Sequence, residues 1–302
     1  MDVNARMIDV MGLKTRVLES GDASSGRAGS RSSGGSRDTP VVMIHGVGGW
    51  AENFREVMEP IARGGRRAIS VDLPGFGESE SPGRVSHFGP TDAFYPKFML
   101  ALLDALGVDR AHLIGSSMGG AVAYMTAVTA PERVRSLTLA ASGGLGTDIA
   151  LFLRLATLPG MITLARLMGD RHQSRAVLRT CFFDAARIPE ALYEESERFG
   201  FRSYPEFVRA LRGGVSILGV KRGIREHWMA QATRYRGPAL VVWGREDAVL
   251  PISHLAEAKA VYPQAEVVVI ERCGHLPMIE RTEEFLAAFL PFVEGAEAAV
   301  AA

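Results

Sequence analysis

One pentapeptide in the chain, Gly115-Ser116-Ser117-Met118-Gly119, has the composition of a turn that presents a nucleophile. It is the only G-x-S-x-G in the sequence, and it follows an apolar run and opens a helix-forming run. A serine that must stand above the end of a strand needs so tight a turn that neighbouring side chains collide, and glycine at both flanking positions removes the collision. The pattern predicts Ser117 as a nucleophile; a glycine-rich helix start is the alternative.

A serine hydroxyl attacks a carbonyl only when a base removes its proton. Among the seven histidines, His275 follows the last strand-like run, on a loop that starts with Gly274, and precedes the C-terminal helix pattern. We therefore expect His275 to be the base, with a histidine of an ordinary surface loop as the alternative. The histidines without this placement are His45, His87, His112, His172, His227 and His254.

The base in turn needs an acid that orients its imidazole and stabilises the imidazolium. The segment WGREDAVLP follows the penultimate strand-like run and offers Glu246 and Asp247, and Asp148 follows the run before that one. The residue pattern leaves these three carboxylates open.

Attack on a carbonyl also creates an oxyanion, which preorganised backbone N–H groups stabilise. The N–H of Met118, directly after the nucleophile, is one expected donor. The glycine-rich segment HGVGG at 45–49 brings a backbone close to the substrate, and Val47 is the expected second donor. We expect His45 to fix this loop rather than to act as a second base. HGVGG lacks the lysine and the spacing of a phosphate-binding loop.

The segment DLPGFGES at 72–79 also combines an acid, a hydroxyl and glycines. Proline and glycine so close to a strand end predict a rigid turn, so we expect a structural role for Asp72 rather than a catalytic one.

Short apolar runs bounded by Gly, Asp or Pro alternate with helical patterns through the chain, which predicts an α/β fold with a mostly parallel central sheet covered by helices on both faces. The predicted strands are 41–45, 67–72, 112–115, 136–141, 239–244 and 266–271. The predicted helices are about 50–63, 91–106, 117–129, 253–261 and 282–293.

The alternation is interrupted once, between 141 and 239, by helix-like pieces with no convincing strand. A structureless connection of that length is improbable in a compact domain, so we expect residues 146–234 to form an inserted helical cap over a core of 1–145 and 235–302. At the N-terminus, 7–10 and 14–19 predict a hairpin. The Gly/Ser-rich segment 20–38 predicts a flexible loop inside a longer hairpin.

The composition is that of a soluble globular protein. Lys plus Arg and Asp plus Glu both number 34, so no net charge favours nucleic-acid binding. Two isolated cysteines favour neither a disulfide framework nor a zinc site, and neither a signal peptide nor a membrane span is indicated. We expect a cytoplasmic protein that needs no metal or organic cofactor; the sequence specifies no oligomeric state.

Together, HGVGG, DLPGFGES, GSSMGG, WGREDAVLP and CGH resemble the motifs of the α/β-hydrolase fold in their order and spacing, from about 41 to 293. The resemblance implies Asp247 as the acid, because it matches the family's WGxxDxxxP pattern. Within the fold, the GGW after the HG, the SMGG at the nucleophile, the SGGLG at 142–146 and the CGH segment are similar to those of the meta-cleavage-product hydrolases. Those enzymes split carbon–carbon bonds in vinylogous diketo acids. The chain departs from them at Ser116, where they usually carry Asn, and at Leu276, where they often carry Trp.

On this basis we expect a serine hydrolase that cleaves carboxylic esters of small to medium apolar acyl groups through an acyl-enzyme on Ser117. Its partner would be a small apolar ester. The alternative is carbon–carbon hydrolysis of the meta-cleavage-product type, which requires a cationic or polar cap group for the substrate carboxylate. Candidates for that group are Arg154, Arg166, Arg175 and Arg179. A remote alternative is a ligand receptor that retains the triad without turnover.

Overall fold

The computed structural model describes residues 3–21, 39–168 and 171–301. Its centre is an eight-stranded sheet in the order β1-β2-β4-β3-β5-β6-β9-β10. The six strands from β4 to β10 in this order are parallel, and β1 and β2 pair antiparallel at one edge. The strands are β1 (Asn4–Val10), β2 (Leu13–Ser20), β3 (Val41–Ile44), β4 (Ala68–Val71), β5 (Ala111–Ser116), β6 (Val134–Ala140), β9 (Ala239–Gly244) and β10 (Glu266–Ile270). The predicted fold is confirmed.

The hairpin at the N-terminus is present as β1 and β2, which turn at Met11 and Gly12. The longer hairpin predicted around 20–38 is wrong, because β2 pairs with β4, and β3 lies between β4 and β5. Residues 22–38 themselves lie outside the described part of the chain.

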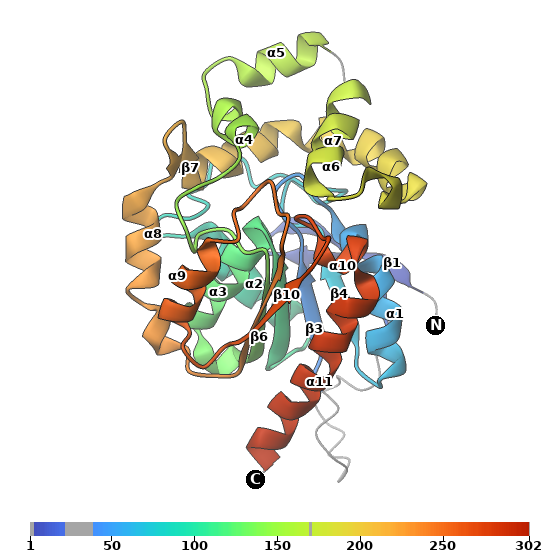
Figure 1. Ribbon diagram of the computed structural model, residues 1–302, viewed down its shortest axis with the longest axis vertical. Coiled ribbons are helices and arrows are strands. Elements are labelled where there is room, and N and C mark those ends of the chain that lie inside the picture. The colour runs from blue at the N-terminus through green and yellow to red at the C-terminus, as the bar shows by residue number, and fades with distance from the viewer. Residues whose placement is uncertain (1–2, 22–38, 169–170, 302) are drawn as a thin grey trace.

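Helices cover both faces of the sheet, as Figure 1 shows. One face carries α2 (Phe94–Ala105), α3 (Met118–Thr129) and α9 (His254–Val261), and the other carries α1 (Arg55–Arg63), α10 (Pro277–Glu280) and α11 (Thr282–Ala301). In β3, Val42 and Ile44 join one buried apolar cluster, and Val41 and Met43 join the other. This alternation explains why the strand is continuously apolar: each face of a parallel sheet is buried.

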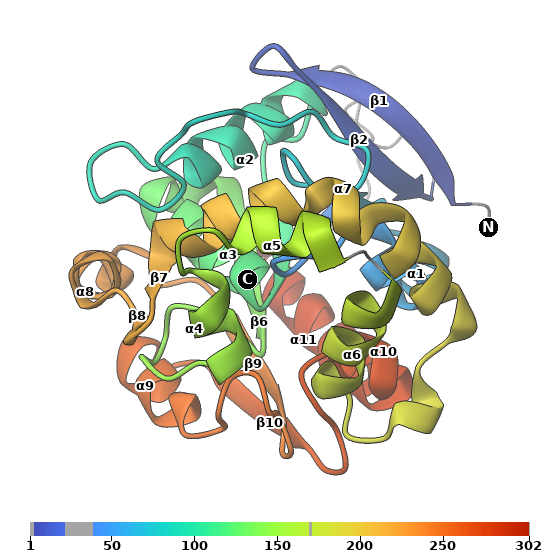
Figure 2. The ribbon, with the colours of Figure 1, turned by 90° about the horizontal axis from the view of Figure 1, so that it is seen from above.

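The segment between β6 and β9 forms helices above the strand ends (Figures 1 and 2). It contains α4 (Leu151–Ala156), α5 (Met161–Met168), α6 (Arg171–Cys181), α7 (Glu190–Gly214) and α8 (Arg222–Met229). The sequence here contains two separate helix-like patterns, PEALYEESERFG at 189–200 and EFVRALRGG at 206–214. In the structure they form one helix, α7, which continues through Pro205. The sequence did not predict α8 or the two-residue strands β7 (Val215–Ser216) and β8 (Gly219–Val220).

Within the described ranges, no helix combines the length and the apolar character that a bilayer crossing requires.

Candidate active site

Ser117 stands in the turn between β5 and α3, near the middle of the sheet. Its φ of 54° and ψ of −120° lie in a region that a residue with a side chain rarely adopts. A Cβ at Gly115 would lie 2.2 Å from the Gly119 carbonyl oxygen, and a Cβ at Gly119 would lie 2.1 Å from the Ile44 carbonyl oxygen. The two glycines of the motif are therefore required by close backbone approach.

The structure brings His275 and Asp247 together. Nδ1 of His275 lies 2.8 Å from Oδ2 of Asp247, and both side chains are buried. Oδ1 of the same carboxylate accepts the backbone N–H groups of Val249 and Leu250, at 2.8 and 3.0 Å. The carboxylate is thus fixed by three hydrogen bonds, and because Nδ1 donates to it, Nε2 is left as the basic nitrogen of the imidazole.

The two other candidate acids lie elsewhere. The Asp148 side chain is 70% exposed and lies 3.6 Å from Arg154. Glu246 accepts the backbone N–H of Cys273 at 2.9 Å, which fixes the start of the loop that carries His275. The geometry therefore favours Asp247 as the partner of the base.

Met118 and Val47, the two residues expected to donate to an oxyanion, line the same pocket as Ser117. Met118 is the first residue of α3, so its N–H has no acceptor within the helix. The loop after β3 passes close by, since a Cβ at Gly46 would lie 2.9 Å from the Ser117 Cβ and 3.5 Å from its Oγ.

His45 is buried and holds the loop. Its Nδ1 donates to the Gly46 carbonyl at 2.7 Å, and its Nε2 accepts the Leu73 N–H at 3.0 Å. Burial lowers the pKa of His45 to about 4. Asp72 is likewise structural: its carboxylate accepts the backbone N–H groups of Ala51 and Glu78.

The lowered pKa of His45 predicts an acid-sensitive stability. The folded protein binds a proton on His45 less well than the unfolded chain does. The contribution of neutral His45 to the free energy of unfolding is therefore complete above pH 6.5 and is lost as the pH falls towards 4. The difference corresponds to an upper limit of about 3 kcal/mol in the free energy of unfolding. Urea unfolding between pH 7 and 4 should show a smaller loss for His45→Gln than for the wild type. Equal losses would contradict the assignment.

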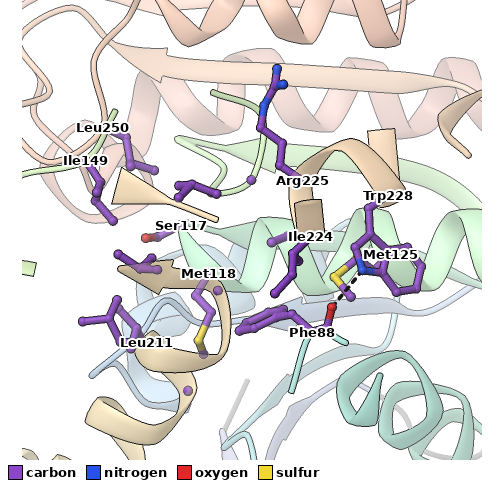
Figure 3. Close-up of a pocket in the computed structure, with 18 of the residues that line it drawn as sticks. Phe88, Ser117, Met118, Met125, Ile149, Leu211, Ile224, Arg225, Trp228 and Leu250 are labelled. Atoms are coloured by element: carbon purple, nitrogen blue, oxygen red, sulfur yellow. Dashed lines mark hydrogen bonds between the residues drawn. The ribbon is translucent and has the colours of Figure 1, made fainter. Parts of the chain in front are cut away.

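A pocket opens at Ser117 between the sheet and the helices above it (Figure 3). Its volume is about 90 Å³. An apolar cavity of about 150 Å³ can hold a benzene molecule, so this one suits a small group. The wall includes Phe88, Met118, Met125, Leu153, Leu211, Val215, Ile224, Trp228 and Leu250.

Arg225 is the arginine among the lining residues, and it was not predicted from the sequence because α8 was not predicted. Its guanidinium points away from the pocket in Figure 3 and bonds to the Leu145 carbonyl and the Glu257 carboxylate. The spacing of Ile224 and Trp228, one helical turn apart, was the available signal for this helix.

None of the cap arginines named from the sequence is among the described residues that line the pocket. Arg154 bonds to the Ile149 carbonyl, and Arg175 pairs with Glu190 and Glu197. Arg179 is exposed, and the side chain of Arg166 lies outside the described residues. The pocket wall thus offers no unpaired cation among the described side chains.

Residues 39–282 match the model of a family described as the alpha/beta hydrolase fold. The chain is 35% identical over 261 residues, 86% of its length, to the dihydrolipoyllysine-residue acetyltransferase component of the acetoin cleaving system of Pseudomonas putida, of which it spans 65%. It is 30% identical to a 2-hydroxy-6-oxo-6-phenylhexa-2,4-dienoate hydrolase of Burkholderia cepacia, over 84% of this chain and 87% of that one.

Among solved structures, a membrane phospholipase A described as a bacterial virulence factor superposes with a TM-score of 0.75 and 25% identity, over 97% of this chain and 86% of that one.

Proposed function

The chain belongs to the α/β-hydrolase family, and on that premise we propose that it is a serine hydrolase that transfers an acyl group to water through Ser117. The observation that carries the proposal is an apolar pocket that opens on Ser117, which is held in a strained turn. The chain also contains a buried hydrogen bond between His275 and Asp247.

The proposed reaction has two halves. Ser117 Oγ attacks the substrate carbonyl and gives its proton to Nε2 of His275, while the Val47 and Met118 N–H groups hold the oxyanion. The intermediate then collapses, the bond to the leaving group breaks, and the leaving group takes the proton from His275. In the second half, water attacks the carbonyl of the acyl-enzyme while His275 takes its proton. The bond to Ser117 then breaks and Ser117 Oγ takes that proton from His275, which releases a carboxylic acid and restores the free enzyme.

Residues 146–234 act in this proposal as a cap. They contribute Leu153, Leu211, Val215, Ile224 and Trp228 to the pocket wall. The apolar chain of the acyl group occupies this pocket, next to the scissile carbonyl, because burial of its surface stabilises binding by about 0.8 kcal/mol per CH₂.

For the scissile bond, carbon–carbon cleavage in a diketo acid is the first candidate. The sequence favoured esters, but several relatives at about 30% identity are named as hydrolases of 2-hydroxy-6-oxo dienoates. In such a reaction the leaving atom is carbon, and the proton from His275 goes to that carbon.

Ester hydrolysis is the second candidate, and the pocket supports it. No unpaired cation among the described lining residues would meet a substrate carboxylate. Ser116 stands where carbon–carbon hydrolases usually carry Asn, and Leu276 where they often carry Trp. One of the similar solved structures is named a membrane phospholipase A.

A comparison of specificity constants separates the two candidates. 2-Hydroxy-6-oxo-6-phenylhexa-2,4-dienoate and p-nitrophenyl esters from acetate to decanoate should be assayed side by side. Carbon–carbon hydrolysis predicts that kcat/KM for the dienoate exceeds that of the best ester by at least about 100-fold, or about 2.7 kcal/mol.

Ester hydrolysis predicts instead that kcat/KM rises about fourfold for each CH₂ added to acetate, then falls once the small pocket is full. No steady turnover of either class would contradict both candidates and favour a receptor that retains the triad.

A further inference from the structure

Glu280, the last residue of α10, is buried and only 2% exposed. Its carboxylate accepts three backbone N–H groups: Gly274 at 2.7 Å, Phe183 at 3.1 Å and Asp184 at 2.8 Å. Three donors on two oxygens suit a carboxylate, which only accepts, and not an amide, which must also donate.

These three donors come from two parts of the chain. Gly274 directly precedes the base, whereas Phe183 and Asp184 follow α6 in the segment above the sheet. A second bond joins the same parts, since the N–H of His275 donates to the Cys181 carbonyl at 2.7 Å. The backbone at Gly274 and His275 is therefore linked to residues 181–184 in two ways. Gly274 is linked through the Glu280 carboxylate, and His275 is linked by its own hydrogen bond to Cys181.

The contact between these two backbones is close. A Cβ at Gly274 would lie 2.5 Å from the Cys181 carbonyl oxygen and 2.8 Å from the Phe183 nitrogen. Burial, with the Asp247 charge as the second cause, raises the pKa of Cys181 to about 12, which agrees with a position of the α6 end beside the acid. Gly274 of the CGH motif is thus needed because Cys181 and Phe183 pack directly against its backbone.

We propose that Glu280 is a positioning residue that couples the cap to the base. His275 is held in place for Ser117 only while the Phe183 and Asp184 N–H groups are hydrogen-bonded to the Glu280 carboxylate. The catalytic half of this inference rests on the proposed function. A merely structural role would lower stability without moving the base.

Glu280→Gln is the test of the carboxylate, because the amide nitrogen must face a backbone N–H and at least one bond is lost. Gly274→Ala breaks the same contact from the other side by steric repulsion. The matched controls are Glu297→Gln and Gly223→Ala. Glu297 is also buried and bonded to His112 and Arg135, but it lies by the opposite end of β5. A Cβ at Gly223 meets nothing within 4 Å.

Two measurements should be made on the full chain. The rate at which a fluorophosphonate labels Ser117 should fall by about 100-fold in Glu280→Gln and Gly274→Ala, the loss expected of a displacement of about 1 Å. Amide hydrogen exchange should become faster in both variants at 182–184 and at 273–276 together. Glu297→Gln should lower Tm while it leaves the labelling rate and these two segments unchanged, and Gly223→Ala should match the wild type.

The coupling is overturned if Glu280→Gln labels at the wild-type rate, if one segment loosens without the other, or if Glu297→Gln gives the same pattern. If the wild type itself is not labelled but both segments loosen together, the mechanical coupling stands and the proposed function fails.

Discussion

Replacement of Ser117 by Ala should abolish turnover, with kcat lower by at least about 10⁴-fold on whichever substrate class is active. The substitution removes the hydroxyl that forms the acyl-enzyme and little else. Ser117 is only 9% exposed, and alanine keeps its Cβ, so thermal unfolding should be nearly unchanged.

Ser116→Ala is the matched control one residue away. The Ser116 hydroxyl is buried and has no hydrogen-bond partner within the described residues, so its loss should leave kcat within about threefold and should not lower stability. An active Ser117→Ala variant together with an inactive Ser116→Ala variant would reverse the assignment.

Asp247→Asn should lower kcat by about 10⁴-fold, because an amide cannot hold Nδ1 of His275 as the protonated nitrogen or stabilise the imidazolium. The isosteric side chain keeps an oxygen for the Val249 and Leu250 N–H groups, so the variant should fold. Steady-state kinetics and circular dichroism on the same preparation separate a catalytic defect from a folding one.

Asp148→Asn is the control, since the Asp148 side chain is largely exposed and lies beside Arg154. It should remain within about twofold of the wild type. Near-normal activity in Asp247→Asn with loss in Asp148→Asn would place the acid after β6 instead.

The sheet was predictable because each parallel strand is buried on both faces and therefore appears as a short apolar run. The boundaries of β9 agree with the predicted 239–244, and the other central strands differ by one or two residues. The turn at Ser117 was predictable for a related reason: its two glycines meet backbone atoms, and that requirement is local in the sequence.

Other features depend on packing between distant segments and gave no local signal. The helix α7 continues through Pro205, a residue type that usually ends or kinks a helix, and its residues Ala210 and Leu211 line the pocket. Arg225 lies in the pocket wall because α8 packs there, and its charge is already paired. The contact of Glu280 with residues almost one hundred positions earlier is of the same kind.

The central claim is that Ser117 is the nucleophile and His275 its base, and a fluorophosphonate tests it directly. After incubation with the probe and proteolysis, mass spectrometry should locate a single adduct on Ser117. The adduct should be absent from Ser117→Ala and should form at least about 100-fold more slowly in His275→Gln. An adduct on Ser116 or another residue, or unchanged labelling in His275→Gln, would contradict the account.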